Sequence, residues 1–303
     1  MESLAWGGVE TFAVNLLGYG LSDRFGMDDP CNASLADQNA FLIPNPLTRP
    51  CENPDPFHFT NSGAWWDQLG DVINDVSKRV GVDQVSLLGW SRGGIVVGGY
   101  TARNPSKVRN LVMLASGYND FPSDPPNPLP QPGPSLVISD RAATFDRWNS
   151  QVDNEACPGQ QDPGILDPLW QLILARDPLG STWGSTDLIT GGVLRSPSQD
   201  LWGWNDENAA KVQVPTLVMS GLRDAVVPTA WMIRLYNALG SSNKVLIKIA
   251  CASHSAVWEG STSPTWAGPH ATVQDAVPNG LPPMRTAEPR RGHFWSTPTA
   301  ALM

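Results

Sequence analysis

The sequence predicts an α/β fold with a mainly parallel sheet and helices on both of its faces. Short apolar runs bounded by turn residues recur along the chain, as is typical of strands that are covered on both sides. Amphipathic helical patterns lie between these runs, and strands that alternate with helices favour a parallel sheet. The predicted strands are Thr11–Leu17, Val85–Gly89, Asn110–Ala115, Pro215–Ser220 and Lys244–Ala250.

Three patterns place helices between or after these strands. In Trp66–Val80, aliphatic residues recur on one helical face. A second helix is predicted to begin at Pro228, because proline is favoured in the first turn of a helix. The last helical pattern covers Pro269–Val277, after the final predicted strand.

Two long segments interrupt the alternation of strands and helices. Residues 25–60, the excursion, are rich in Pro, Asn and Asp, and residues 118–213, the insert, are far longer than an ordinary loop. The insert contains a helical pattern at Asp167–Arg176 and several tryptophans, which favour packed structure over a disordered linker. The predicted organisation is a core of residues 1–117 and 214–277, a mostly helical cap formed by residues 118–213, and a disordered or aberrant tail of residues 278–303. We expect the excursion and the insert to lie near the same edge of the sheet.

Composition and charge exclude several classes of protein. The 303 residues are 41% hydrophobic and carry a formal net charge of −9. A nucleic-acid binder needs a basic patch, and the one visible cluster, Arg285, Arg290 and Arg291, lies in the tail. No apolar run reaches the roughly 18 residues of a membrane span, and the first residues do not resemble a signal peptide. The sequence therefore predicts no nucleic-acid partner and no transmembrane segment, and it leaves the oligomeric state open.

The four cysteines lack the spacing of a metal site. None forms a C-x-x-C pair, so we predict no metal and no cofactor. Cys31 and Cys51 bracket a Pro- and Asn-rich loop, where a disulfide and two free thiols are equally compatible with the sequence. Asn32 begins a glycosylation sequon in that loop. Together these features weakly favour secretion and leave the localisation open.

Ser91 is the candidate nucleophile. The motif Gly89-Trp90-Ser91-Arg92-Gly93 follows a predicted strand and precedes a helical segment, the context that G-x-S-x-G requires. We expect a strained serine with an exposed hydroxyl, and a collision for any side chain larger than glycine two positions before or after it. N–H groups at the start of the helix would face a developing oxyanion. The backbone N–H of Arg92 is the predicted oxyanion donor, and Trp90 is a candidate for the substrate pocket. The alternative is a solvated serine in a glycine-rich turn.

A serine nucleophile requires a base, and the base requires an orienting carboxylate. His254 follows the last predicted strand, and Asp224 follows the strand before it. Because the carboxyl ends of parallel strands meet at one edge, we expect Ser91, Asp224 and His254 to converge there. A surface histidine and a turn aspartate are the structural alternatives, and Asp120 is the reserve for the acid.

The order Ser, Asp, His along the chain resembles that of the α/β-hydrolase superfamily. Gly18-Tyr-Gly-Leu-Ser-Asp-Arg24 is similar to the family's G-x-G-x-S phrase, and residues 214–228 are similar to its acid-bearing strand and loop. The resemblance covers residues 1–277, with the insert loosely matched. It implies a serine hydrolase that acts by acyl transfer on a small-molecule substrate, foremost a carboxyl ester. Haloalkane dehalogenases and epoxide hydrolases are excluded, because they use an aspartate where this chain has Ser91.

Two other functions fit the same residues. A related enzyme could hydrolyse a carbon–carbon bond or carry out perhydrolysis, since the insert and the pocket decide the substrate. The chain could also be a catalytically inactive fragment or a ligand-binding homologue. Turnover of a panel of esters would distinguish these alternatives.

The resemblance also implies that parts of the family fold are missing. The family's early strands and its His-Gly loop, which supplies the second oxyanion donor, have no counterpart, and Met1–Ala5 resembles the end of the helix that follows this loop. The strands Thr11–Leu17 and Val85–Gly89 would then be separated by a gap of about 9–10 Å, unless the sheet closes and pairs them directly. Prolines beyond Val277 would end the last helix early. We therefore expect a truncated chain of low stability and low activity.

Overall fold

The computed structural model describes residues 9–119, 121–263, 265, 267–280 and 299–302. A six-stranded sheet has the strand order β1-β10-β3-β4-β8-β9, and every neighbouring pair is parallel. Its strands are β1 (Val9–Phe12), β3 (Val85–Trp90), β4 (Val108–Leu114), β8 (Thr216–Gly221), β9 (Lys244–Ile249) and β10 (Thr299–Leu302). The predicted parallel α/β sheet is confirmed.

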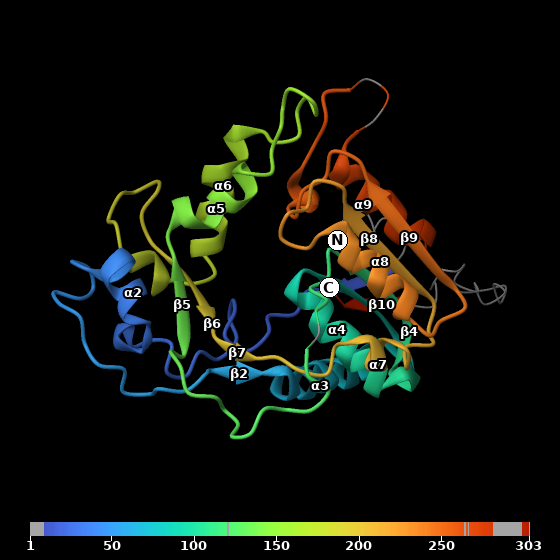
Figure 1. Ribbon diagram of the computed structural model, residues 1–303, viewed down its shortest axis with the longest axis horizontal. Helices are drawn as coiled ribbons and strands as arrows, with labels where there is room; N and C mark the ends of the chain where they lie inside the picture. The colour runs from blue at the N-terminus through green and yellow to red at the C-terminus, as the bar shows by residue number, and fades with distance from the viewer. Residues whose placement is uncertain (1–8, 120, 264, 266, 281–298, 303) are drawn as a thin grey trace.

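Helices cover both faces of this sheet (Figure 1). α4 (Arg92–Arg103) joins β3 to β4, and α8 (Thr229–Ala238) joins β8 to β9, so right-handed crossovers place both helices on one face. α3 (Ser62–Val80) packs beside α4 and begins before the predicted Trp66. α9 (Pro269–Gly280) contacts β8 and β9, the strands that α8 also contacts, and therefore covers the opposite face.

The first strand lies earlier and is shorter than predicted. β1 ends at Phe12, whereas the apolar pattern extends over Thr11–Leu17. Beyond Phe12, side chains of α3 bond the backbone: the Leu17 N–H donates to Gln68 Oε1 at 2.8 Å, and the Leu17 carbonyl accepts from Trp65 Nε1 at 3.2 Å. The backbone at Leu17 is therefore hydrogen-bonded to side chains of α3 and not to a neighbouring strand, although the apolar sequence pattern continues to this residue.

The expected gap in the sheet is occupied by β10, which corrects the prediction. Thr299 and Leu302 align with Val9 and Phe12 of β1, and Leu302 also aligns with Leu87 of β3. Two parallel strands one position apart leave unpaired N–H and C=O groups that an extended segment between them can bond. The last helix ends at Gly280, and the cluster Arg285, Arg290 and Arg291 lies outside the described residues, as does Met1–Ala5.

Most of the excursion and the insert form a mixed α/β region beside the sheet, on the left in Figure 1, in which strands accompany the helices. The end of the insert, α7 (Asp206–Ala209), lies instead beside α4 and α8. The antiparallel strands β5 and β6 pair within the insert, and β2 of the excursion pairs with β7 of the insert. The other short helices and strands of the excursion and the insert are α2 (Leu35–Asp37), a π-helical turn (Gln38–Leu42), β2 (Thr60–Asn61), β5 (Leu136–Ser139), α5 (Arg141–Asn149), α6 (Leu166–Leu174), β6 (Leu194–Pro197) and β7 (Gln199–Asp200). Single 3₁₀ turns occur at Pro30–Asn32, Pro105–Lys107, Pro163–Ile165, Gly180–Thr182 and Ala256–Trp258.

Apolar packing and one buried cation hold this region together. All five tryptophans of the insert are buried, as expected from the sequence: Trp148, Trp170, Trp183, Trp202 and Trp204. The buried guanidinium of Arg195 forms two hydrogen bonds with Asp177, at 2.6 and 2.9 Å, and donates to the carbonyl of Met27 at 2.7 Å. Met27 belongs to the excursion, so Arg195 joins the two segments. Cys31 and Cys51 form the disulfide that the loop composition allowed.

Candidate active site

Ser91 lies in the sharp turn between β3 and α4. Its φ of 56° and ψ of −118° are strained for a residue with a side chain. The turn is held by the Ser91 N–H, which donates to Leu114 O, and by the Ser91 carbonyl, which accepts from the Gly117 N–H, both at 3.0 Å. The strained serine at the carboxyl end of β3 agrees with the predicted strand–turn–helix geometry.

Only one of the two predicted glycine requirements holds. A Cβ added to Gly89 would lie 2.5 Å from the carbonyl oxygen of Gly93, so Gly89 must lack a side chain. A Cβ on Gly93 would have no neighbour within 4 Å, and the prediction for this residue is wrong. The second constraint falls on Gly94, where a Cβ would collide with Ser116. α4 is rotated so that Gly94, and not Gly93, faces Ser116 in the segment that follows β4.

The structure brings the three residues Ser91, His254 and Asp224 together. His254 Nε2 is 2.8 Å from Ser91 Oγ, and His254 Nδ1 is 2.9 Å from Asp224 Oδ2. Both distances are within hydrogen-bond range. A neutral imidazole with its proton on Nδ1 donates to the carboxylate and leaves Nε2 free to accept the serine proton.

The Asp224 carboxylate is fixed by the turn that follows β8. Its side chain has no exposed surface, and Oδ1 accepts from the backbone N–H groups of Val226 at 2.9 Å and Val227 at 2.7 Å. The second oxygen, Oδ2, therefore faces His254. α8 begins directly after Pro228, in agreement with the helix start predicted at this proline. Asp120, the reserve for the acid, lies outside the described residues.

Trp90 contacts the loop that follows β9 and carries His254, here called the histidine loop, and it also lines a cavity. Its indole N–H donates to the carbonyl oxygen of His254 at 2.9 Å, and its ring lies 5.7 Å from the His254 ring, centroid to centroid. The ring of Trp258 packs edge-on against Trp90 at 5.0 Å. Trp90 also lines an apolar cavity of about 350 Å³ beside the turn that carries Ser91. The other lining residues are Val14, Leu16, Leu69, Leu88, Gly89, Gly93, Val96, Val97 and Val257.

Arg92 occupies the first position of α4, where a backbone N–H has no carbonyl partner within the helix. Its side chain is bonded to groups other than the three residues Ser91, His254 and Asp224: one guanidinium nitrogen donates to Tyr19 Oη at 2.8 Å and to Gln199 Oε1 at 3.0 Å. Tyr19 belongs to the Gly-Tyr-Gly phrase, and Gln199 belongs to the insert. The side chain thus joins three segments at the edge of the site, and the main chain remains the candidate oxyanion donor.

A family model described as the alpha/beta hydrolase fold matches residues 2–261. The chain belongs to the α/β-hydrolase family. This match confirms the predicted family and fold.

Individual known proteins are similar to the chain over part of its length or at low sequence identity. The poly(3-hydroxyalkanoate) polymerase subunit PhaC of Haloferax mediterranei is 31% identical over 85 residues, which are 28% of this chain and 13% of that protein's length. Two solved structures are also similar to this chain. The monoacylglycerol lipase of Paleococcus ferrophilus has 14% identity and a TM-score of 0.43, and the matched region is 74% of this chain and 76% of the lipase. The serine hydrolase CarC, involved in carbazole degradation, has 17% identity and a TM-score of 0.47, with 76% and 74% covered.

The other histidines of this α/β-hydrolase lie elsewhere. His58 Nδ1 is 2.7 Å from Asp200 Oδ1 at the junction of the excursion and the insert. His270, at the start of α9, bonds the carbonyl of Val257, and His293 lies outside the described residues. In the part of the chain that the structure describes, no three His, Cys, Asp or Glu side chains are grouped to hold a metal ion. Within the same residues, no helix has the length and apolarity needed to cross a membrane.

Sequence reasoning missed the second disulfide, Cys157–Cys251, which joins the insert to the loop before His254. One signal was available: once Cys31 and Cys51 are paired, Cys157 and Cys251 are the two that remain. Their separation of 94 residues gave no local pattern to read.

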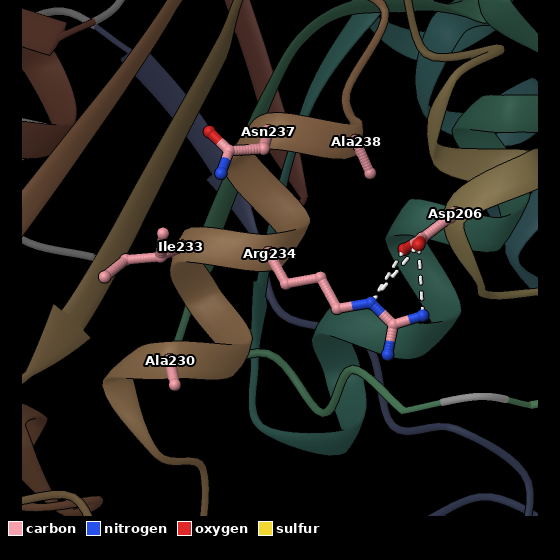
Figure 2. Close-up of a pocket in the computed structure, with 6 residues that line it drawn as sticks. All are labelled: Asp206, Ala230, Ile233, Arg234, Asn237 and Ala238. Carbon is pink, nitrogen blue, oxygen red and sulfur yellow. Dashed lines mark hydrogen bonds and ion pairs between the residues drawn. The ribbon is translucent and has the colours of Figure 1, made fainter.

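A surface depression of about 520 Å³ lies over α7 and α8 and contains none of Ser91, Asp224 and His254 (Figure 2). Arg234 NH2 bonds Asp206 Oδ2 across it at 3.0 Å, and the hydroxyl of the buried Tyr118 donates to Asp206 Oδ1 at 2.6 Å. The Tyr118 hydrogen bond, and after it the Arg234 hydrogen bond, lower the pKa of Asp206 below its ordinary value. This ion pair joins the insert to the core.

Tyr118→Phe is expected to lower the melting temperature at pH 7 more than at pH 3. Because the pKa of Asp206 is depressed in the folded state, its interactions stabilise the fold above the unfolded pKa of about 4 and are lost as pH falls through the folded pKa. Melting curves of both proteins at the two pH values measure this. Tyr100→Phe is the matched control, because burial alone raises the pKa of Tyr100. An equal loss at both pH values for Tyr118→Phe would contradict the assignment.

Proposed function

We propose that the chain is a serine hydrolase that cleaves carboxyl esters by acyl transfer through Ser91, His254 and Asp224. The observation that carries the proposal is the continuous chain of hydrogen-bond distances, 2.8 Å from Ser91 Oγ to His254 Nε2 and 2.9 Å from His254 Nδ1 to Asp224 Oδ2. A strained serine and a buried carboxylate accompany it, as nucleophilic catalysis requires.

In the first half-reaction, Ser91 Oγ attacks the carbonyl carbon of the ester while His254 Nε2 accepts the hydroxyl proton. The negative charge that develops on the carbonyl oxygen faces the backbone N–H of Arg92. Asp224 stabilises the imidazolium. His254 then donates the proton to the leaving alcohol oxygen, the carbon–oxygen bond breaks, and the acyl group remains on Ser91.

In the second half-reaction, His254 removes a proton from water, and the resulting hydroxide attacks the acyl-enzyme. Collapse of the second tetrahedral intermediate returns the proton to Ser91 Oγ and releases the carboxylic acid. Over the cycle one carbon–oxygen bond of the ester breaks, the acyl–Ser91 bond forms and breaks again, and water is the co-reactant that supplies the new carbon–oxygen bond.

The apolar cavity supports an uncharged, aliphatic acyl group. Its lining holds aliphatic side chains, glycines and Trp90, and three of the lining residues, Gly89, Trp90 and Gly93, flank Ser91 in the sequence. Burying an aliphatic chain there contributes roughly 0.8 kcal/mol per methylene group. A charged acyl group would lose its hydration without a partner.

The test is a panel of p-nitrophenyl esters from acetate to palmitate, together with a fluorophosphonate probe. We expect turnover of the short and medium esters, faster for butyrate and hexanoate than for acetate, and covalent labelling of the native chain but not of the heat-denatured chain. Ester binding without turnover and without labelling would favour the ligand-binding alternative and contradict the proposal.

A further inference from the structure

The side-chain amide of Gln151 lies between the two loops that carry Asp224 and His254. Its Oε1 accepts from the N–H of Ala225, the residue after Asp224, at 2.9 Å, and from the N–H of His254 itself at 3.2 Å. Gln151 is a buried residue of the insert, just after α5, and its Nε2 donates to the carbonyl of Arg147 at 2.6 Å. Both loop groups are donors, so the amide oxygen must face them.

A disulfide fixes the same insert segment to the same histidine loop. Cys157 lies shortly after Gln151, and it is bonded to Cys251, which follows β9 and shortly precedes His254. Cys251 has a φ of 54°, a left-handed conformation at which the chain turns from the strand toward the histidine. The covalent bond therefore anchors the start of the histidine loop to the insert.

Glu259 makes a third connection, at the end of the histidine loop. Its buried carboxylate accepts from Trp148 Nε1 at 2.9 Å and from Gln160 Nε2 at 3.1 Å, both in the insert. Its other oxygen accepts from the backbone N–H of Ser253 at 2.8 Å. Residues 148–160 thus hold the histidine loop before, at and after His254.

We propose that Gln151 is a positioning residue of the catalytic centre, and that residues 148–160 are a fixed part of that centre. The proposal rests on the proposed function. One oxygen that accepts from the N–H groups of Ala225 and His254 sets the separation of the two loops, and with it the 2.9 Å distance between His254 Nδ1 and Asp224 Oδ2. Without it, two N–H groups lose a partner and the loops can separate.

The test compares Gln151→Met with Gln161→Met. Gln161 is a buried glutamine just beyond this segment, and its side chain bonds Asn149 within the insert, not the histidine loop. Gln151→Met is expected to lower kcat for a p-nitrophenyl ester by roughly 10- to 100-fold, the effect of a displacement of about 1 Å, with little change in KM. Gln161→Met should keep the kcat of the original chain.

Hydrogen exchange of the backbone amides tests the same proposal without turnover. The N–H groups of Ala225 and His254 should exchange faster in Gln151→Met than in Gln161→Met at equal melting temperature. Equal kcat and equal exchange in the two variants would overturn the positioning role. If the original chain neither turns over esters nor takes the fluorophosphonate label, the proposed function fails, and exchange alone decides the role of Gln151.

Discussion

Replacing Ser91 by alanine is expected to lower kcat for ester hydrolysis by about 10⁶-fold and to abolish fluorophosphonate labelling. Alanine removes the hydroxyl oxygen that lies 2.8 Å from His254 Nε2, so no acyl-enzyme can form. Residual hydrolysis would come from substrate binding and the remaining oxyanion donor. Steady-state kinetics and in-gel fluorescence of the labelled chain measure the two effects.

Ser86→Ala is the matched control for this experiment. Ser86 lies in the same strand, β3, and its buried hydroxyl accepts from Asn110 Nδ2 at 3.1 Å. Its loss removes a serine from the strand without touching His254, so labelling should persist. Labelling that survives in Ser91→Ala would remove Ser91 from the mechanism.

Asp224→Asn is expected to lower kcat by roughly 10⁴-fold while the fold is retained. The asparagine carbonyl oxygen can keep the hydrogen bonds from Val226 and Val227, which places the amide nitrogen opposite His254 Nδ1. Nδ1 must then accept instead of donate, and the imidazole proton moves to Nε2. A protonated Nε2 cannot take the proton of Ser91. Kinetics beside a melting curve separate this loss from unfolding.

Asp120→Asn tests the reserve acid in the same assay. If Asp224 orients the imidazole, Asp120→Asn should retain most of the activity. A large loss in Asp120→Asn, with Asp224→Asn close to the original chain, would reverse the assignment.

Residues that directly follow strands could be predicted from the sequence. Ser91, Asp224 and His254 each come after a short apolar run, and parallel strands bring their carboxyl ends to one edge. Local sequence therefore places each side chain, and the sheet supplies the proximity. The glycine requirement after Ser91 was less predictable. Whether Gly93 or Gly94 faces the segment after β4 depends on how α4 is rotated after the turn, and the motif alone does not determine this rotation.

Contacts made by partners distant in sequence could not be predicted. Gln151 lies in the insert outside its predicted helical pattern, Asp167–Arg176, and its bonds to Ala225 and His254 span 74 and 103 positions. The end of β1 is set by side chains of α3, and the sheet position beside it is taken by β10. In each case a tertiary partner overrides the local pattern, as is general for β-structure.

The bond between Cys157 and Cys251 also has a consequence for how the protein is made. Synthesis runs from the N-terminus, so the sulfur of Cys157 leaves the ribosome 94 residues before its partner. Cys31 and Cys51 are already present, and four thiols allow three pairings. Early closure of Cys31–Cys51, 20 residues apart, removes both competitors from Cys157.

The last thiol to emerge is therefore the one that fastens the loop carrying His254. Cytosolic glutathione and thioredoxin keep such thiols reduced, whereas secretory compartments oxidise them. A chain produced in a reducing host would carry Ser91 and Asp224 without the covalent anchor of the histidine loop. Oxidation after release from the ribosome, in the periplasm or in a refolding buffer, is the condition that installs it.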